Sequence, residues 1–237
     1  MQAEGLYRFI DALHENRQCI VFQNDVFALM SAISWLVSHG YRDNDKPFEE
    51  LKALACAGKV IVTCGACSSF AVNLFQELGL AARRVHTLSL LDRNGYNDGH
   101  ILTEVMADGK WIVFDPDVGA LYSHRGKRLN ILQLTQQARR GDFQIDPLSL
   151  SMPIATGHFT AAGYAYDLWY ETVLSTPELR QQTFQRVLQV PVIVEDGISY
   201  FTTPTEAERC RIEELYSEEP YEYLPETEFG ERFYSYL

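Results

Sequence analysis

Three residues in the middle of the chain have the side-chain types that nucleophilic catalysis requires. Cys67 supplies a thiol, His100 an imidazole that can take a proton, and Asp115 a carboxylate that can orient the imidazole. A thiol nucleophile needs a base within hydrogen-bond reach, and the base needs a partner that fixes its tautomer. These residues in this order predict acyl transfer through a thioester, with Cys67 as nucleophile, His100 as base and Asp115 as orienter.

A helix is predicted to carry the thiol. Residues 68–78 have apolar side chains at helical spacing and are followed by Gly79, a residue type that commonly ends helices. Cys67 would then lie at the N-terminus of this helix. The positive end of the helix dipole and the unpaired backbone N–H groups there would stabilise a thiolate and later an oxyanion.

A hairpin is predicted to carry the other two residues. His100 opens a strand over residues 101–106, and Asp115 closes a strand over residues 111–114. Asp108-Gly109 between the strands is a strong signal for a tight turn. Antiparallel pairing would bring the end of the second strand back beside the start of the first, so His100 and Asp115 are expected to be neighbours.

The remaining segments complete an α+β pattern, in which helices precede a helix packed on antiparallel strands. No repeat or linker divides the chain clearly. We expect a catalytic core with N-terminal helices at residues 1–150 and a C-terminal extension at 151–237 that packs on it. Helices are further predicted at residues 5–15, 24–38, 47–57, 129–139, 176–189 and 205–216, strands at 59–63 and 82–91, and a hairpin at 190–202.

The ordered motifs around these residues resemble the core of the transglutaminase-like superfamily. GACSSFAVNLFQELGLAARRV matches its Gly-x-Cys helix start and Leu-Gly exit, GHILTEV its His-x-x-x-Glu-Val strand, and GKWIVFDP its Gly-x-Trp strand ending in Asp-Pro. The match covers residues 62–118. The resemblance assigns Cys67, His100 and Asp115 to the nucleophile, base and orienter. The sequence departs from the family at Ile101, where an aromatic residue is common.

The resemblance implies a papain-like core in which the helix with the cysteine packs on an antiparallel sheet. Members of the superfamily include cysteine peptidases, protein cross-linking enzymes and peptide-bond-forming enzymes, all of which form a thioester. The expected function is therefore that of a cysteine hydrolase or acyltransferase acting on a peptide or amide substrate. Hydrolysis is favoured over amine transfer, because water needs no second binding site.

Other residues are weaker candidates for contact with a substrate. Glu104 is on the same side of the strand as His100, because side chains alternate along a strand. Trp35 and Trp169 could line a cleft, although core packing is the default for both. A second oxyanion donor is required, and Gln23 or Trp35 could supply it.

Two other functions are compatible with the same segment. Cys64 and Cys67 form a CxxC motif between a strand and a helix, which is also the local pattern of thioredoxin-like thiol–disulfide oxidoreductases. A transglutaminase-like fold can also serve as a non-catalytic peptide-binding or scaffold module. Against the second alternative, a binding module has no reason to keep the three residue types in register.

Composition limits the partners and the location. The formal net charge of −12 disfavours a nucleic-acid partner. The sequence has no run of about 18 apolar residues, so no membrane span is expected. An odd number of cysteines, five, and an N-terminus without a signal-peptide pattern predict a cytoplasmic protein. We expect no cofactor and no metal, since neither the EF-hand spacing nor a second zinc-ligand pair is present.

Overall fold

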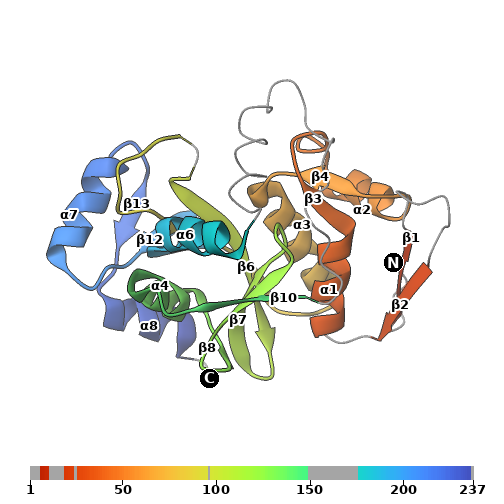
Figure 1. Cartoon of the computed structure of the whole chain (residues 1–237). Helices are drawn as coiled ribbons and strands as arrows, with labels where there is room; N and C mark the ends of the chain where they lie inside the picture. The colour runs from red at the N-terminus through yellow and green to blue at the C-terminus, as the bar shows by residue number, and fades with distance from the viewer. Residues whose placement is uncertain (1–5, 11–18, 24–25, 96, 149–175, 236–237) are drawn as a thin grey trace.

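The computed structural model describes residues 6–10, 19–23, 26–95, 97–148 and 176–235. The protein has an α+β architecture built on one nine-stranded sheet, in which β9 pairs only with β8 and the others follow the order β10-β8-β7-β6-β5-β11-β12-β13 (Figure 1). Neighbouring strands of this sheet are antiparallel except β12 and β13.

The strands of this sheet are β5 (Ala82–Leu88), β6 (Gly99–Ala107), β7 (Lys110–Asp115), β8 (Ala120–His124), β9 (Lys127–Arg128), β10 (Gln144–Pro147), β11 (Val190–Glu195), β12 (Ile198–Phe201) and β13 (Tyr221–Tyr223). The helices are α1 (Val26–Leu36), α2 (Phe48–Ala55), α3 (Cys64–Glu77), α4 (Ile131–Arg140), α6 (Pro177–Val187), α7 (Glu206–Leu215) and α8 (Glu226–Tyr234). Two smaller sheets pair β1 (Leu6–Ile10) with β2 (Cys19–Gln23), and β3 (Val37–His39) with β4 (Val60–Val62).

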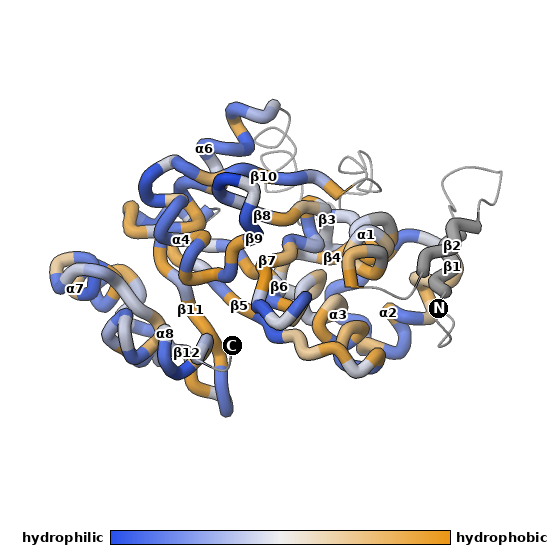
Figure 2. Tube along the Cα trace, turned by 90° about the horizontal axis from the view of Figure 1, so that it is seen from below, coloured by the Kyte–Doolittle hydropathy of each residue, from blue (hydrophilic) through white to orange (hydrophobic). Residues whose placement is uncertain are grey.

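Helices cover both faces of the central strands. Side chains of α1 and α3 pack with Val105 and Phe114 on one face, whereas α4, α6 and α8 pack with Leu102 and Val113 on the other. This alternation along β6 and β7 is the period of two that a strand imposes. Figure 2 shows hydrophobic residues concentrated along α1, α3 and the central strands, and a more hydrophilic α6.

The predicted hairpin is confirmed, and its two strands diverge at the end away from the turn. Asp108 and Gly109 both have positive φ, 50° and 73°, as a two-residue turn of this kind requires. Pairing between β6 and β7 runs from the turn only as far as Thr103 and Phe114. Residues 99–102 of β6 therefore pair with β5 alone, which leaves room beside them for another element.

The first predicted helix is wrong where the structure describes it. Residues 6–10 form β1, which pairs antiparallel with β2. Tyr7, Phe9 and Ile10 are strand-favouring residue types. The apolar sequence Ile20-Val-Phe22 supplies the partner strand, which a prediction from helical spacing alone does not consider. The helices expected over residues 24–38, 47–57, 129–139, 176–189 and 205–216 are confirmed; each is shorter than expected, and α4 ends one residue later.

The C-terminal segment extends the same sheet. β11 pairs with β5, so strands from both sides of the expected division near residue 150 share one set of hydrogen bonds. The acidic tail contributes β13 and α8, and Phe229 and Phe233 of α8 are buried. The division itself lies next to residues 149–175, outside the described ranges, and stays a prediction.

The helices are short. The longest one in the described part of the chain, α3, has 14 residues, and none there has the length and apolar character that a membrane crossing requires.

Candidate active site

His100 and Asp115 form a buried pair, as the hairpin predicted. His100 Nε2 donates to Asp115 Oδ2 over 2.8 Å, and the two side chains are 6% and 0% exposed. The bond spans the gap in which β6 and β7 diverge. Because Nε2 is committed to the carboxylate, Nδ1 is the ring nitrogen that remains for another partner.

The Asp115 carboxylate is held by further donors that the sequence did not indicate. The Tyr122 hydroxyl donates to Oδ2 over 2.8 Å, and the backbone N–H groups of Asp117 and Val118 approach Oδ1 at 3.1 and 3.4 Å. Burial and the nearby Asp115 raise the pKa of Tyr122 well above its ordinary value, so the phenol keeps its proton and remains a donor. The carboxylate is thus fixed on both oxygens.

The backbone of His100 is locked to β5. Thr87 Oγ1 accepts a hydrogen bond from the His100 N–H at 3.2 Å and donates to the His100 carbonyl at 3.3 Å. A Cβ added at Gly99 would lie only 2.2 Å from the Thr87 carbonyl oxygen. Gly99 therefore lets β5 approach closely, and tight pairing of β5 with β6 fixes the backbone beside His100.

An aromatic wall covers the imidazole. Phe184 of α6 packs on His100 with ring centroids 5.5 Å apart, and on Tyr122 with centroids 5.9 Å apart. Phe184 is separated from His100 by more than eighty positions in the sequence, and only tertiary packing identifies it. Its ring excludes water from one side of the His100–Asp115 pair.

The helix that carries the cysteines begins earlier than predicted. α3 starts at Cys64, with Thr63 as its N-cap residue, so Cys67 is the fourth helical residue rather than the residue before the helix. The Cys67 N–H already donates to the Thr63 carbonyl over 2.8 Å. Asn44 accepts a hydrogen bond from the Thr63 N–H and fixes the chain at this point. The prediction that Cys67 occupies the N-terminus of the helix is wrong.

The surroundings of Cys67 are those of a buried structural thiol. The residue is 1% exposed and belongs to the core between α1, α3 and the sheet. Burial, followed by the negative charges of Asp117 and Asp115, raises the pKa of Cys67 well above its ordinary value. These properties oppose formation of a thiolate, which is the reactive form.

Cys64 occupies the position that was expected for Cys67. It is partly exposed, it is the first residue of α3, and its side chain is close enough to His100 to help raise the pKa of the imidazole. With Asp115 on Nε2, the order of contacts is thiol, imidazole and carboxylate. The CxxC motif contains Cys64, but the Gly-x-Cys pattern predicted the second cysteine, Cys67, as the nucleophile.

The first turn of α3 fits into the gap beside β6. A Cβ at Gly65 would be 3.2 Å from Ile101 Cδ1, so glycine allows this approach without any shift of the Ile101 side chain. The Ser68 hydroxyl donates over 2.6 Å to the Leu102 carbonyl, in the part of β6 that does not pair with β7. The helix start thus replaces a strand partner and brings Cys64 beside His100.

The helix start also presents hydrogen-bond donors. Cys67 is the first residue whose N–H donates within the helix, and no side chain of the described residues caps the N–H groups of Cys64, Gly65 and Ala66. Unpaired N–H groups at a helix N-terminus stabilise negative charge. An oxyanion next to Cys64 could be bound there.

The charge state of His100 is set by opposing effects. Burial alone would lower the pKa of His100, but the Asp115 charge and hydrogen bond, with the Cys64 contact, outweigh burial and raise the pKa well above its ordinary value. The imidazolium form is therefore stabilised next to Cys64. A protonated imidazole favours a neighbouring thiolate.

A second buried histidine–aspartate pair lies behind the site. His39 Nδ1 is 3.0 and 3.1 Å from the two carboxylate oxygens of Asp117, and both side chains are buried. After burial, the charge of Asp117 makes the largest contribution to the raised pKa of Cys67. The pair joins β3 to the turn that follows β7, and so fixes the backbone next to Asp115.

Of the weaker candidates for contact with a substrate, the structure describes only the side chain of Glu104. Glu104 is fully buried and accepts hydrogen bonds from Arg83, the Ile131 N–H and Tyr234. It is four residues from His100 along β6, roughly 13 Å away, so it holds the fold together and is not placed to contact a substrate beside His100. Trp169 and the side chains of Trp35 and Gln23 lie outside what the structure describes.

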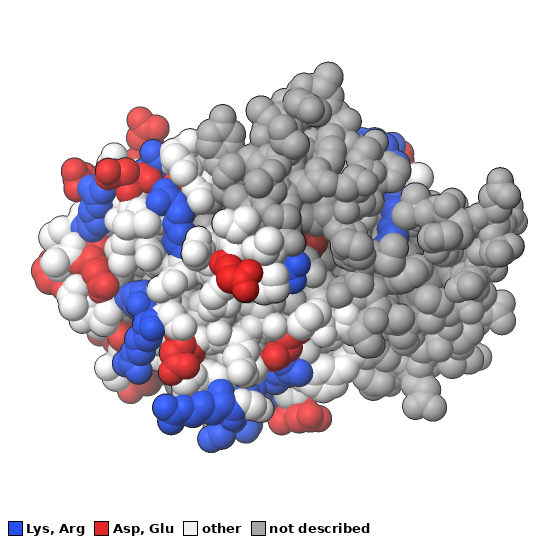
Figure 3. Space-filling view, viewed as in Figure 1, with Lys and Arg blue, Asp and Glu red and all other residues white. Residues whose placement is uncertain are grey.

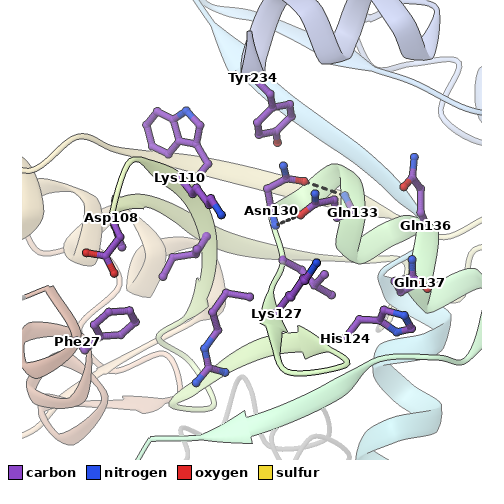
Figure 4. Close-up of a pocket in the computed structure, with 15 residues that line it drawn as sticks. Phe27, Asp108, Lys110, His124, Lys127, Asn130, Gln133, Gln136, Gln137 and Tyr234 are labelled. Carbon is purple, nitrogen blue, oxygen red and sulfur yellow. Dashed lines mark hydrogen bonds between the residues drawn. The ribbon is translucent and has the colours of Figure 1, made fainter. Parts of the chain in front are cut away.

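A cavity in the described part of the chain lies away from these residues. It has a volume of about 910 Å³ and is lined by residues of the β6–β7 turn, including Asp108 and Lys110, and by Lys127, Asn130 and Gln133 (Figure 4). The turn is at the opposite end of β6 from His100. This cavity therefore receives none of the groups with catalytic character.

A metal site is not evident in the described ranges, where no cluster of three or more histidine, cysteine or acidic side chains is placed to bind an ion. Comparison with known proteins gives no family assignment. No protein-family model matches the chain, and no curated protein sequence is similar to it.

Proposed function

We propose that the protein is a thiol-dependent acyl-transfer enzyme in which Cys64 is the nucleophile, His100 the base and Asp115 the orienter. One observation carries the proposal: Cys64 at the start of α3 is close enough to His100 to help raise the pKa of His100, whose Nε2 is bound to a buried carboxylate. This is the arrangement that activates a thiol for attack on a carbonyl carbon. Relation to the transglutaminase-like superfamily remains part of the proposal.

The proposed reaction uses each group once in each half. His100 Nδ1 takes the thiol proton, and the Cys64 sulfur attacks the carbonyl carbon of a peptide or amide. The N–H groups at the start of α3 bind the oxyanion. The imidazolium then gives its proton to the leaving amine, which leaves a thioester on Cys64. Asp115 keeps its charge and holds the ring throughout.

Water completes the proposed cycle. His100, neutral after the amine leaves, takes a proton from water, whose oxygen attacks the thioester carbon and releases a carboxylic acid. We favour hydrolysis over amine transfer, because water needs no second binding site. The narrow approach of α3 to β6 and the cover by Phe184 would favour an extended substrate over a bulky one.

The test compares two alanine variants. Cys64→Ala is expected to lower turnover of any peptide amide found in a substrate screen by about 10³-fold or more, whereas Cys67→Ala is expected to retain activity within about 10-fold in the folded protein. Cys56→Ala, at an exposed cysteine, is the control.

A second readout needs no substrate. Peptide mapping after brief iodoacetamide treatment at pH 6.5 should find the adduct on Cys64, since an ordinary thiol is only about 1% ionised there. Faster labelling of Cys67, or reduction of a disulfide substrate in the absence of amide turnover, would remove the proposal.

A further inference from the structure

The two cysteines of α3 are close enough to react with each other. They are the first and fourth residues of the helix, and residues three apart on a helix are neighbours with Cβ atoms about 5–6 Å apart. The charge of Cys64 acts on Cys67, which reflects the same proximity. A disulfide needs Cα atoms about 4.4–6.8 Å apart, a range that one helical turn satisfies.

The first turn can make the small adjustment that a disulfide requires. Thr63 makes no side-chain capping hydrogen bond, and the N–H groups of Cys64, Gly65 and Ala66 make no intrahelical bond. Movement of the Cys64 side chain toward Cys67 therefore breaks no capping hydrogen bond. Gly65 between them lacks a side chain that would resist the change.

The two thiols are unequal in a way that suits two different roles. Cys64 is partly exposed and contacts an imidazole with raised pKa, so it can meet a small oxidant from solvent. Cys67 is 1% exposed, and burial raises its pKa, so it is protected from direct oxidation. The first thiol can be oxidised and the second can only respond to it.

We propose that Cys64 is a site of reversible oxidation by peroxides and that Cys67 resolves it as a Cys64–Cys67 disulfide. The inference rests on the reactivity assigned to Cys64 in the proposed function. The disulfide would block the nucleophile and at the same time keep it from irreversible oxidation. A low-molecular-weight thiol would restore the enzyme.

The chemistry balances in two steps. The Cys64 thiolate attacks one oxygen of hydrogen peroxide, the O–O bond breaks, and the leaving hydroxide takes a proton from the imidazolium of His100 to form water. Cys67 then attacks the sulfenic sulfur, an S–S bond forms, and the hydroxyl leaves as water with the Cys67 proton. Overall, two thiols lose two electrons and the peroxide gains them.

The experiment follows both cysteines in one peptide. Trypsin cleavage after Lys59 and Arg83 releases residues 60–83, which contain Cys64 and Cys67 and no other cysteine. The full-length protein is treated with hydrogen peroxide, blocked with N-ethylmaleimide and mapped by mass spectrometry. The wild type should show this peptide lighter by two hydrogens, and dithiothreitol should restore both maleimide sites.

The matched variant removes the resolving thiol. In Cys67→Ala, and in Cys67→Ser as a second form, the peptide should instead gain two or three oxygens on Cys64, and dithiothreitol should not reverse this. Cys56 and Cys210, both exposed, report ordinary thiol oxidation in the same samples. If both variants fail to fold, dimedone in the wild type should trap the sulfenic acid on Cys64 and reduce disulfide yield.

Two outcomes would overturn the inference. One is overoxidation of Cys64 in the wild type without the disulfide, and the other is oxidation of Cys64 at the same rate as Cys56. The mapping needs no amide substrate, so these outcomes are separate from failure of the proposed amide turnover.

Discussion

The Asp115 carboxylate is the residue on which the charge of the site depends. It raises the pKa of His100 against the lowering effect of burial. Imidazolium is therefore expected to persist above pH 6.5, and thiolate chemistry that needs it should fall only when the pH rises through this raised pKa.

Asp115→Asn should change the pH dependence in a defined direction. The variant loses the charge that stabilises imidazolium, so the alkaline fall of turnover should move to lower pH, and Cys64 alkylation at pH 6.5 should slow by about 10²-fold or more. Alkylation rates between pH 5 and 9 measure this. Asp142→Asn, at an exposed carboxylate beside His124, is the control. An unchanged profile in Asp115→Asn would contradict the assigned role.

His86 is expected to make the free energy of unfolding depend on pH. Burial, and next the charge of Arg84, lower the pKa of His86 to about 4, and its Nε2 has no hydrogen-bond partner among the described residues. The unfolded chain binds a proton below about pH 6.5 and the folded protein does not until about pH 4, so stability is lost as pH falls through this window.

The expected loss at pH 5 is about 2 kcal/mol from this group. Urea unfolding at pH 7 and pH 5 should show that His86→Phe reduces the difference between the two conditions by this amount. His124→Gln, at a partly exposed histidine, should leave the difference nearly unchanged. Equal pH dependence in wild type and His86→Phe would rule out this origin.

At the scale of elements, the site depends on how closely β5 and α3 approach the start of β6. A Cβ at Gly99 would be 2.2 Å from a backbone oxygen of β5, which no side-chain movement can relieve. Gly99→Ala should therefore cost about 1–3 kcal/mol and displace His100, with loss of rapid Cys64 alkylation.

Gly230 supplies the matched control for this change. A Cβ at Gly230, inside α8, would meet nothing within 4 Å, so Gly230→Ala should stabilise the protein by about 0.5–1 kcal/mol and leave alkylation unchanged. Thermal unfolding and iodoacetamide labelling of both variants check the pair. Normal labelling in Gly99→Ala would show that the strand contact does not position His100.

Local patterns were sufficient for the elements whose partners are close in sequence. The β6–β7 hairpin follows from Asp108-Gly109 between two apolar strands, and the His100–Asp115 pair follows from that hairpin. β1 was misread because its partner strand, rather than its own spacing, determined its conformation.

Long-range contacts account for what the sequence did not indicate. The start of α3 is fixed by the contact of Asn44 with Thr63 and by the space that Gly65 leaves beside Ile101, and neither is visible in local helix propensity. For the same reason local patterns favoured Cys67 over Cys64, the cysteine that we propose as nucleophile. Phe184 contacts the His100 imidazole from α6, a helix far from His100 in the sequence.

At the scale of the whole molecule, the described surface of one face carries charges of both signs side by side (Figure 3). Figure 3 shows acidic and basic side chains interspersed over the described part of one face. Arg232 pairs with Glu195 and Arg209 with Glu213 at partly exposed positions. Such pairs contribute little to stability, so the fold depends on its buried contacts.

Glu104 is a buried residue of β6 that connects this strand to β5, α4 and α8, at the end away from the site. It accepts from Arg83 on β5, from the first N–H of α4 and from Tyr234 of α8. Glu104→Gln would leave the Arg83 guanidinium, only 19% exposed, without its counter-charge. The free energy of unfolding should fall by about 3 kcal/mol.

The site should be insensitive to this loss while the protein stays folded. Glu104 is roughly 13 Å from His100 along the strand, beyond direct contact, so Cys64 alkylation in folded Glu104→Gln should match the wild type within about two-fold. Glu195→Gln, at the exposed pair with Arg232, should cost under about 1 kcal/mol. Urea unfolding and labelling at low temperature give both quantities. A large drop in Cys64 labelling with little loss of stability would contradict this prediction. It would show that Glu104 acts on the candidate active site from the other end of β6.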